Sequence, residues 1–306
     1  MKTDDVSFAQ RPNILVTSIV SYGSTNIGFA PYSDYWRQVR KLCATELLSA
    51  KRVKSFQLIR EEEVSNVIKR IASHSGSTIN LSEEISSVTS KLEKLHERVD
   101  RILQNIVKEH KESMTTKRGK LEAEDLVDTF LKIQEDGDLK FPLTENNVKA
   151  VILSDGKGTR VRREFAGKGT VEESGIHELK FIKAVVKETL RLHPPAPLLL
   201  PREYPDSWTE PERFNPERFL DSWLDYKGTD FEFIPFGAGR RMCPDMSFAI
   251  PSVELSLANF IYHFDWKLPT GIKPEDLDMT EIISLSVRRK QNLHLIPIPY
   301  NPFPAE

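Results

Sequence analysis

Cysteine is scarce in this sequence, which contains Cys43 and Cys243 as its two cysteines among 306 residues. So few thiols exclude a small fold held together by disulfides, and they exclude a zinc site built from four thiolates. Any thiol chemistry therefore depends on a single sulfur.

An excess of positive charge is also missing. Lysine and arginine number 43 against 45 aspartate and glutamate, which gives a formal net charge of −2. A chain without a basic excess offers no broad surface to a nucleic-acid backbone. We therefore expect no nucleic-acid partner.

Long hydrophobic runs are absent as well. The first residues carry charges in place of an apolar core, so they resemble neither a signal peptide nor a membrane anchor. The most apolar stretch, 194–201, is rich in proline and far shorter than the ~18 residues that a spanning helix needs. The sequence predicts a soluble chain without a transmembrane anchor, associated with a membrane at most through a surface patch.

What is present is an ordinary globular composition, 39% hydrophobic and 29% charged, with helical periodicity over much of the chain. These features predict a mainly α fold with small β regions. The predicted helices are 34–48, 51–71, 82–112, 121–134, 144–153, 160–165, 177–192 and 246–264. Asn80 or Ser82 is the expected N-cap of the third helix. Alternation over 283–298 predicts a terminal hairpin.

An irregular junction is predicted at 154–170, where glycine and basic residues replace the apolar pattern. It contains the tetrapeptide Gly-Lys-Gly-Thr twice. Neither copy lies in the G-x-x-x-x-G-K-[ST] pattern that a phosphate-binding loop requires between a strand and a helix. We therefore interpret the junction as a loop interrupted by a short helix.

The most informative segment extends from Phe236 to Asp245 and contains Cys243. Two glycines permit a tight turn, arginines bring positive charge, and the cysteine precedes a predicted helix whose N-terminal amides stabilise a thiolate. Such a sulfur suits a metal, and the alternative is a buried structural cysteine. Cys43, which has apolar neighbours at helical spacing, is expected to be a packed core thiol.

This segment resembles the haem-binding loop of the cytochrome P450 superfamily. The family pattern F-x-x-G-x-R-x-C-x-G is met by Phe236, Gly239, Arg241 and Cys243. Three other family motifs occur in the family's order, namely W-x-x-x-R at Trp36 and Arg40, E-x-x-R at Glu188 and Arg191, and Pro-Glu-Arg-Phe around Arg218. The chain is identified as a member, and it is most similar to plant microsomal enzymes that hydroxylate terpenoids, alkaloids or phenylpropanoids.

The resemblance implies a haem b (iron protoporphyrin IX) cofactor and residues that hold it. Cys243 is the implied axial ligand of the iron, and a thiolate ligand favours O–O bond cleavage. Arg40 and Arg241 are the implied partners of the haem propionates, and Trp36 covers the ring edge.

A structural triad is implied by the same resemblance. Glu188 and Arg191 lie on one face of a helix, and Arg218 belongs to the segment that follows. A carboxylate between two guanidinium groups accepts charge-assisted hydrogen bonds. These bonds hold the segment around Arg218, called the meander in this family, beneath the haem.

The implied activity is that of a haem-thiolate monooxygenase, which inserts one atom of O2 into a small lipophilic substrate. The electrons come from NADPH through NADPH–cytochrome P450 reductase as the implied partner. The resemblance implies a location at the cytosolic face of the endoplasmic reticulum membrane. A chain without the membrane anchor would instead be located in the cytoplasm.

The sequence departs from the family by missing segments. It begins well inside a normal member, and further segments are missing at 90–91, after 153 and after 203. We therefore expect a single incomplete domain over 1–306, with a helical part (1–153), the junction (154–170) and a proximal haem-binding part (171–306). Such excisions are typical of an altered splice or gene prediction, or of a decaying gene copy.

The segment missing after 153 would carry an acid and an alcohol that donate protons during oxygen activation. Asp155 and Thr159 have the right chemical types but the wrong separation. We therefore assign no oxygen-activating pair.

A point change lies at Asp245, two residues after the implied ligand, where the family has glycine. Aspartate is a good helix cap. Its carboxylate is also expected to raise the pKa of the Cys243 thiol and to disfavour reduced iron. The prediction is weaker haem retention or a lower reduction potential.

Three functions are therefore open. The first is an active monooxygenase, and the second is an inactive remnant that still binds haem. The third is a haem-free helical interaction protein with a basic docking face for an acidic reductase domain, formed by Arg37, Arg40, Lys41, Arg240 and Arg241.

Overall fold

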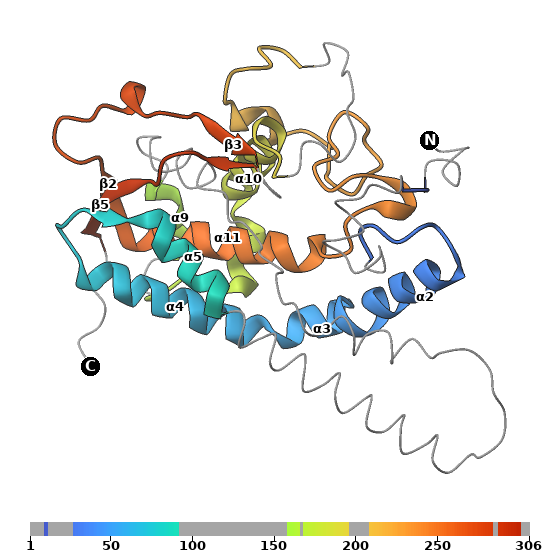
Figure 1. The fold of residues 1–306 in the computed structure, drawn as a ribbon. Helices are drawn as coiled ribbons and strands as arrows, with labels where there is room; N and C mark the ends of the chain where they lie inside the picture. Colours follow the sequence, from blue (N-terminus) through green and yellow to red (C-terminus); the bar gives the residue numbers. More distant parts are fainter. Residues whose placement is uncertain are drawn as a thin grey trace.

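The computed structural model describes residues 9–11, 27–91, 158–165, 168–195, 208–283 and 287–300 (Figure 1). Its helices are α2 (Asp34–Leu42), the π-helix η1 (Cys43–Leu47), α3 (Ala50–Ser55), α4 (Gln57–Ser73), α5 (Leu81–Lys91), α9 (Gly158–Glu164), α10 (Lys180–Leu192) and α11 (Met246–His263). Short 3₁₀ turns are η2 (Glu173–Glu178), η4 (Pro216–Phe219), η5 (Gly239–Arg241) and η6 (Pro274–Asp276). The strands are β1 (Ile79–Asn80), β2 (Phe264–Lys267), β3 (Glu281–Ile283), β4 (Val287–Arg289) and β5 (His294–Pro299). The expected mainly α fold with small β regions is confirmed.

Helix α11 lies at the centre of the described structure, between α4 and α10, with α9 packed near its C-terminal end (Figure 1). Twelve of its 18 residues are buried. A helix that is buried on nearly every side needs apolar residues all round, and Leu255, Leu257 and Phe260 are among those that supply them. The residues before α11 are therefore attached to the most deeply packed element of the fold.

The predicted helices at 34–48 and 51–71 form with altered ends. Ser33 caps α2 by accepting a hydrogen bond from the backbone of Trp36, and η1 then continues the turn from Cys43. Phe56 separates α3 from α4, because its backbone leaves the helical region. Each of the two predicted helices is thus built from two shorter ones.

The helix predicted from Ser82 begins at Leu81 as α5. Asn80 is its cap, since its side chain accepts from the backbone of Glu83 at 3.4 Å. Ser82 instead accepts from the backbone N–H of Leu293 at 2.7 Å and so fixes the approach to β5. The rest of this predicted helix, and those at 121–134 and 144–153, lie outside the described residues.

The predicted helices at 160–165, 177–192 and 246–264 correspond to α9, α10 and α11. The predicted hairpin at 283–298 is wrong. β4 pairs with β3, in the register Glu281 to Arg289, whereas β5 is the middle strand of the antiparallel sheet β1-β5-β2. The physical reason is that β5 meets partners from distant segments, which a local alternation pattern does not reveal.

The buried carboxyl group of Glu254 on α11 is expected to make stability depend on pH. Glu254 is 6% exposed, and burial raises the pKa of its carboxyl from 4.5 to about 7 although Lys183 and Lys187 lower it. A folded-state pKa above the unfolded value favours the folded chain below pH 4.5, and this contribution is lost as pH rises through 7. We expect Glu254→Gln to raise the free energy of unfolding by about 2 kcal/mol more at pH 8 than at pH 5. Urea unfolding at both pH values measures this, and an equal effect at both would contradict it.

Candidate functional site

The loop before α11 is closed by its own backbone. The Cys243 N–H donates to the Phe236 carbonyl at 2.8 Å, and the Met242 N–H donates to Gly239 at 3.1 Å. Gly237 and Gly239 have φ values of +76° and +67°, a region that side chains other than glycine rarely adopt. The two glycines therefore allow the turn that carries Cys243 to the start of the helix.

The Cys243 thiol is a free cysteine and partly exposed. Burial raises its pKa, and the charge of Asp245 raises it further, as the sequence predicts. Hydrogen bonds from the backbone of Asp245 and Met246 and the charge of Arg40 lower it. The helix amides thus approach the sulfur as the sequence predicted, but burial decides the net direction, and this corrects the expectation of a stabilised thiolate. A bound cation would supply the missing stabilisation.

Arg241 lies next to this loop and is held by distant backbone. It donates to the carbonyls of Ala9 at 2.7 Å and Ala30 at 2.6 Å, and its guanidinium lies 4.1 Å from the centre of the Trp36 ring. Trp36 is 3% exposed, and its indole N–H donates to the Ile27 carbonyl at 2.8 Å. The structure therefore brings Trp36 and Arg241 together.

Three arginines form what we call the cationic cluster, Arg11, Arg40 and Arg241. Burial lowers the pKa of each, and the charges of Arg11 and Arg40 help to lower that of Arg241 to about 10. Within the described part of the chain, none of the three forms an ion pair with a carboxylate. Partly buried positive charge without a counter-ion is suited to bind an anion.

The sequence indicated Arg40 and Arg241 for this region but not Arg11. Arg11 donates to the Gly28 carbonyl at 3.0 Å. Arg40 is also near Cys43. The sequence predicts a packed core thiol at Cys43, but this residue is only partly buried and does not belong to the main core, so that prediction is wrong. The fold that brings residues 9–11 to the loop is long-range, so no local signal in the sequence identified Arg11.

Glu188 on α10 is completely buried and accepts four hydrogen bonds. Arg191 donates two, at 2.8 and 3.0 Å, Arg218 donates one at 3.1 Å, and the Asn215 N–H donates one at 2.7 Å. The indole ring of Trp208 lies 5.3 Å from the guanidinium carbon of Arg191 and 5.7 Å from that of Arg218. The structure thus brings together the three residues of the expected triad, and Trp208 was missed.

Both arginines of this triad also donate to backbone carbonyls. Arg191 contacts Pro211, and Arg218 contacts Thr209 and Arg213. The segment that leads to η4 is therefore attached to α10 by charged side chains with satisfied donors.

Asp245 occupies the N-cap position of α11 but does not cap it with its side chain. Its Oδ2 is buried and has no hydrogen-bond partner in the part of the chain that the structure describes, and burial raises the carboxyl pKa to about 7. The expected side-chain cap is therefore wrong. A buried acceptor without a donor destabilises its surroundings.

Phe236 lies at the other end of the loop. Its ring meets that of Tyr226 edge to face, with centroids 6.0 Å apart, and its carbonyl accepts from Cys243. Among the described residues, no group of three or more His, Cys, Asp and Glu could hold a metal.

No helix in the described ranges is both long and apolar enough to cross a membrane.

Comparison with known proteins identifies the family. The family model for cytochrome P450 matches residues 159–207 and 203–296. The chain is 41% identical to cytochrome P450 71D11 of Lotus japonicus over 414 positions, covering the whole chain and 84% of that relative. It is 40% identical to desmethyl-deoxy-podophyllotoxin synthase of Sinopodophyllum hexandrum, covering 97% of the chain and 80% of that protein.

These alignments also support internal deletions. The first extends over 414 positions against a chain of 306 residues, so the relative contains internal segments that this chain lacks. The two matches to the family model meet at 203–207, where the sequence predicts a missing segment.

The fold agrees with the family. A zebra fish cytochrome P450 solved with abiraterone superimposes with a TM-score of 0.65 at 19% identity, covering 97% of this chain and 89% of that one. This likeness confirms the expected fold class, a cytochrome P450 fold with segments missing. The chain therefore belongs to the cytochrome P450 family and is similar to plant monooxygenases of that family.

Proposed function

We propose that this chain binds haem b through Cys243 and acts as a monooxygenase on a small lipophilic substrate, with electrons from NADPH supplied by NADPH–cytochrome P450 reductase. The observation that carries the proposal is the placement of a free thiol, approached by helix amides, beside the cationic cluster. The family's cytosolic face of the endoplasmic reticulum is the proposed place of action, with the cytoplasm as the alternative.

The residues present fit haem b. The group carries one iron and two carboxylates, and the site offers one sulfur together with three arginines that have no carboxylate partner among the described residues. We assign Cys243 to the iron, Arg40 and Arg241 to the propionates and Trp36 to the ring edge. Arg11 is an additional candidate for the propionates.

Each of these residues has a task that follows from its contacts. When bound, the haem supplies oxygen activation, and the thiolate ligand favours O–O cleavage. Gly239 and Phe236 shape the loop that presents the sulfur, and the arginines neutralise carboxylates. Glu188, Arg191 and Arg218 position the segment that leads to η4 through their hydrogen bonds.

The proposed organisation is a single domain over 1–306, with its proximal haem-binding part at 171–306. The residues described between 168 and 300 supply Cys243, Arg241 and the whole triad. The helical part, 1–153, supplies Trp36 and Arg40.

An inactive haem-binding remnant is the second candidate, and the lengths of the alignments favour it. Relatives contain internal segments that this chain lacks, and no acid and alcohol pair was assigned from the sequence. Asp155 and Thr159 do not have the required separation, and Asp155 lies outside the described residues. A haem-free interaction protein is the third, and Arg240 and Arg37 of its proposed basic face both contact Tyr32.

Product analysis under labelled oxygen tests the proposed function. The full chain is incubated with reductase, NADPH, ¹⁸O2 and a panel of terpenoid and phenylpropanoid compounds. One ¹⁸O atom in a product, with substrate-dependent NADPH consumption, is the expected result. A chain that binds haem but shows neither is the remnant.

The side chain of Asp245 is expected to affect both haem affinity and the reduction potential. Because its carboxylate is buried and unsatisfied beside the thiol, we expect Asp245→Gly to bind haem about tenfold more tightly and to have a higher reduction potential. Asp245→Asn separates charge from volume, since it removes the charge at nearly constant size. Haem titration and potentiometry measure both quantities, and equal affinity and potential in all three proteins would refute the prediction.

A further inference from the structure

The charged side chain of Arg60 is buried close to the start of α11. Arg60 on α4 is 3% exposed, and all of its nitrogens have acceptors. Its Nε and one terminal nitrogen donate to the two carboxylate oxygens of Glu173 at 2.7 and 2.6 Å, and the other terminal nitrogen donates to the Val53 carbonyl at 2.9 Å. The ion pair joins α4 to η2, which lies more than a hundred residues later, and the hydrogen bond to Val53 adds the neighbouring α3.

Arg60 also contacts α11. Its guanidinium carbon lies 5.2 Å from the centre of the Phe248 ring, and Phe56 meets the same ring edge to face at 6.2 Å. Phe248, Phe56 and Val53 form a small buried cluster separate from the main core. A cation over an aromatic face attracts the ring and fixes its position.

Phe248 in turn is bonded to the residues after Cys243. Its N–H donates to the Asp245 carbonyl at 3.0 Å in the first turn of α11. The Asp245 N–H is one of the two that approach the Cys243 sulfur. A continuous series of contacts therefore leads from Arg60 through Phe248 to the thiol.

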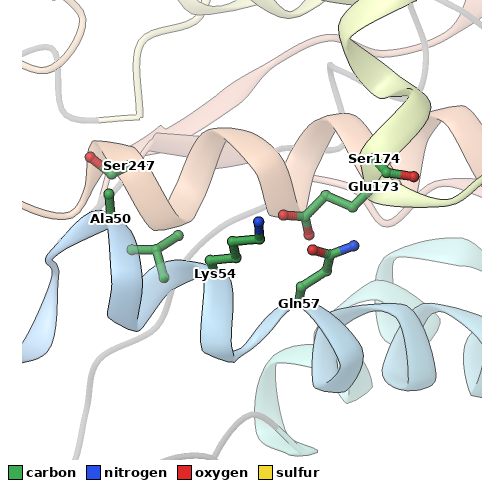
Figure 2. A pocket seen from close by; sticks show the side chains of 7 residues that line it. Ala50, Lys54, Gln57, Glu173, Ser174 and Ser247 are labelled. Carbon is green, nitrogen blue, oxygen red and sulfur yellow. The ribbon is translucent and has the colours of Figure 1, made fainter.

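The carboxylate side of the ion pair faces an open groove (Figure 2). A cavity of about 320 Å³ is lined by Glu173 and by residues of α3, α4 and α11. Figure 2 shows Lys54 and Gln57 directed toward Glu173 in this groove. Glu173 is 17% exposed whereas the Arg60 side chain is 2% exposed, so water reaches the carboxylate but hardly the guanidinium.

We propose that Arg60, held by Glu173, is a positioning residue that fixes Phe248 and thereby the approach of the α11 amides to the Cys243 sulfur. This inference rests on the proposed function, because it assumes that Cys243 ligates the haem iron. Loss of the Arg60 side chain then makes the position of the Cys243 sulfur less fixed, although no residue assigned to the haem is removed.

A double-mutant cycle tests the inference, using Arg60→Met, Glu173→Gln and the two together in the full chain. The measurements are urea unfolding and the rate at which the reduced carbon monoxide complex loses its thiolate-type Soret band. Glu173→Gln leaves a buried cation unpaired and should destabilise most, whereas the double variant removes both charges and should regain stability. If Arg60 positions Phe248, Arg60→Met and the double variant both lose the band about tenfold faster than the parent, although the double variant is stable.

The outcomes separate the two claims. A stable double variant that keeps the band as long as the parent chain does overturns the positioning role and leaves a structural ion pair. Absence of the band from the parent chain overturns the proposed function itself. The matched control is the exposed pair of Arg213 and Glu210, 68% and 57% exposed, where Arg213→Met should change neither measurement.

Discussion

Replacement of Cys243 by alanine is expected to abolish thiolate ligation and to weaken haem binding by more than about hundredfold. The reason is that the proposal gives the iron one protein ligand, the Cys243 sulfur, whereas the cationic cluster binds carboxylates and not iron. Haem content after gel filtration and the electron paramagnetic resonance spectrum of the ferric protein measure the two effects.

Cys43 provides the matched control for this experiment. It is the other cysteine of the chain, it is partly buried like Cys243, and Arg40 also lies near it. Cys43→Ala should keep both the haem and its thiolate signature. If Cys43→Ala loses them and Cys243→Ala does not, the assignment of the ligand is wrong.

Replacement of Glu188 by alanine is expected to lower the free energy of unfolding by about 3–5 kcal/mol. Its carboxylate is fully buried and is shared by Arg191 and Arg218, so its removal leaves two guanidinium groups and the Asn215 N–H without their acceptor. Glu188→Gln keeps the shape and one acceptor oxygen and should lose less. Chemical denaturation measures both.

An exposed pair of the same type supplies the comparison for Glu188. Glu210 and Arg213 are also separated by three residues, but their side chains are 57% and 68% exposed. Glu210→Ala should therefore change stability by less than about 1 kcal/mol. Equal losses at Glu188 and Glu210 would show that burial does not make the triad important.

The motifs of the site could be predicted from the sequence because they are local. The spacing of Gly239, Arg241 and Cys243 within one turn, and of Glu188 and Arg191 on one helix, is visible without knowledge of the fold. The contribution of Arg11 was not visible, because it depends on the return of residues 9–11 to a loop more than two hundred positions away. The hairpin prediction failed for the same reason, since β5 pairs with strands from distant segments.

Two buried charges show a different limit. Arg60 lies in an Arg-Glu-Glu-Glu run on an amphipathic helix, and such a run usually faces solvent. Its burial depends on Glu173, more than a hundred residues later. At Asp245 the residue type favoured a cap, yet its crowded surroundings leave one carboxylate oxygen without a donor. Residue type predicts capacity for a bond, and packing decides whether the bond forms.

The reduced carbon monoxide difference spectrum of the full chain, produced with a supply of haem, shows whether Cys243 ligates the haem iron. We expect a thiolate-type Soret band, because Cys243, the helix amides and the cationic cluster are assembled without the segments that the chain lacks. A chain that unfolds cooperatively in urea and yet shows no such band would refute ligation by Cys243.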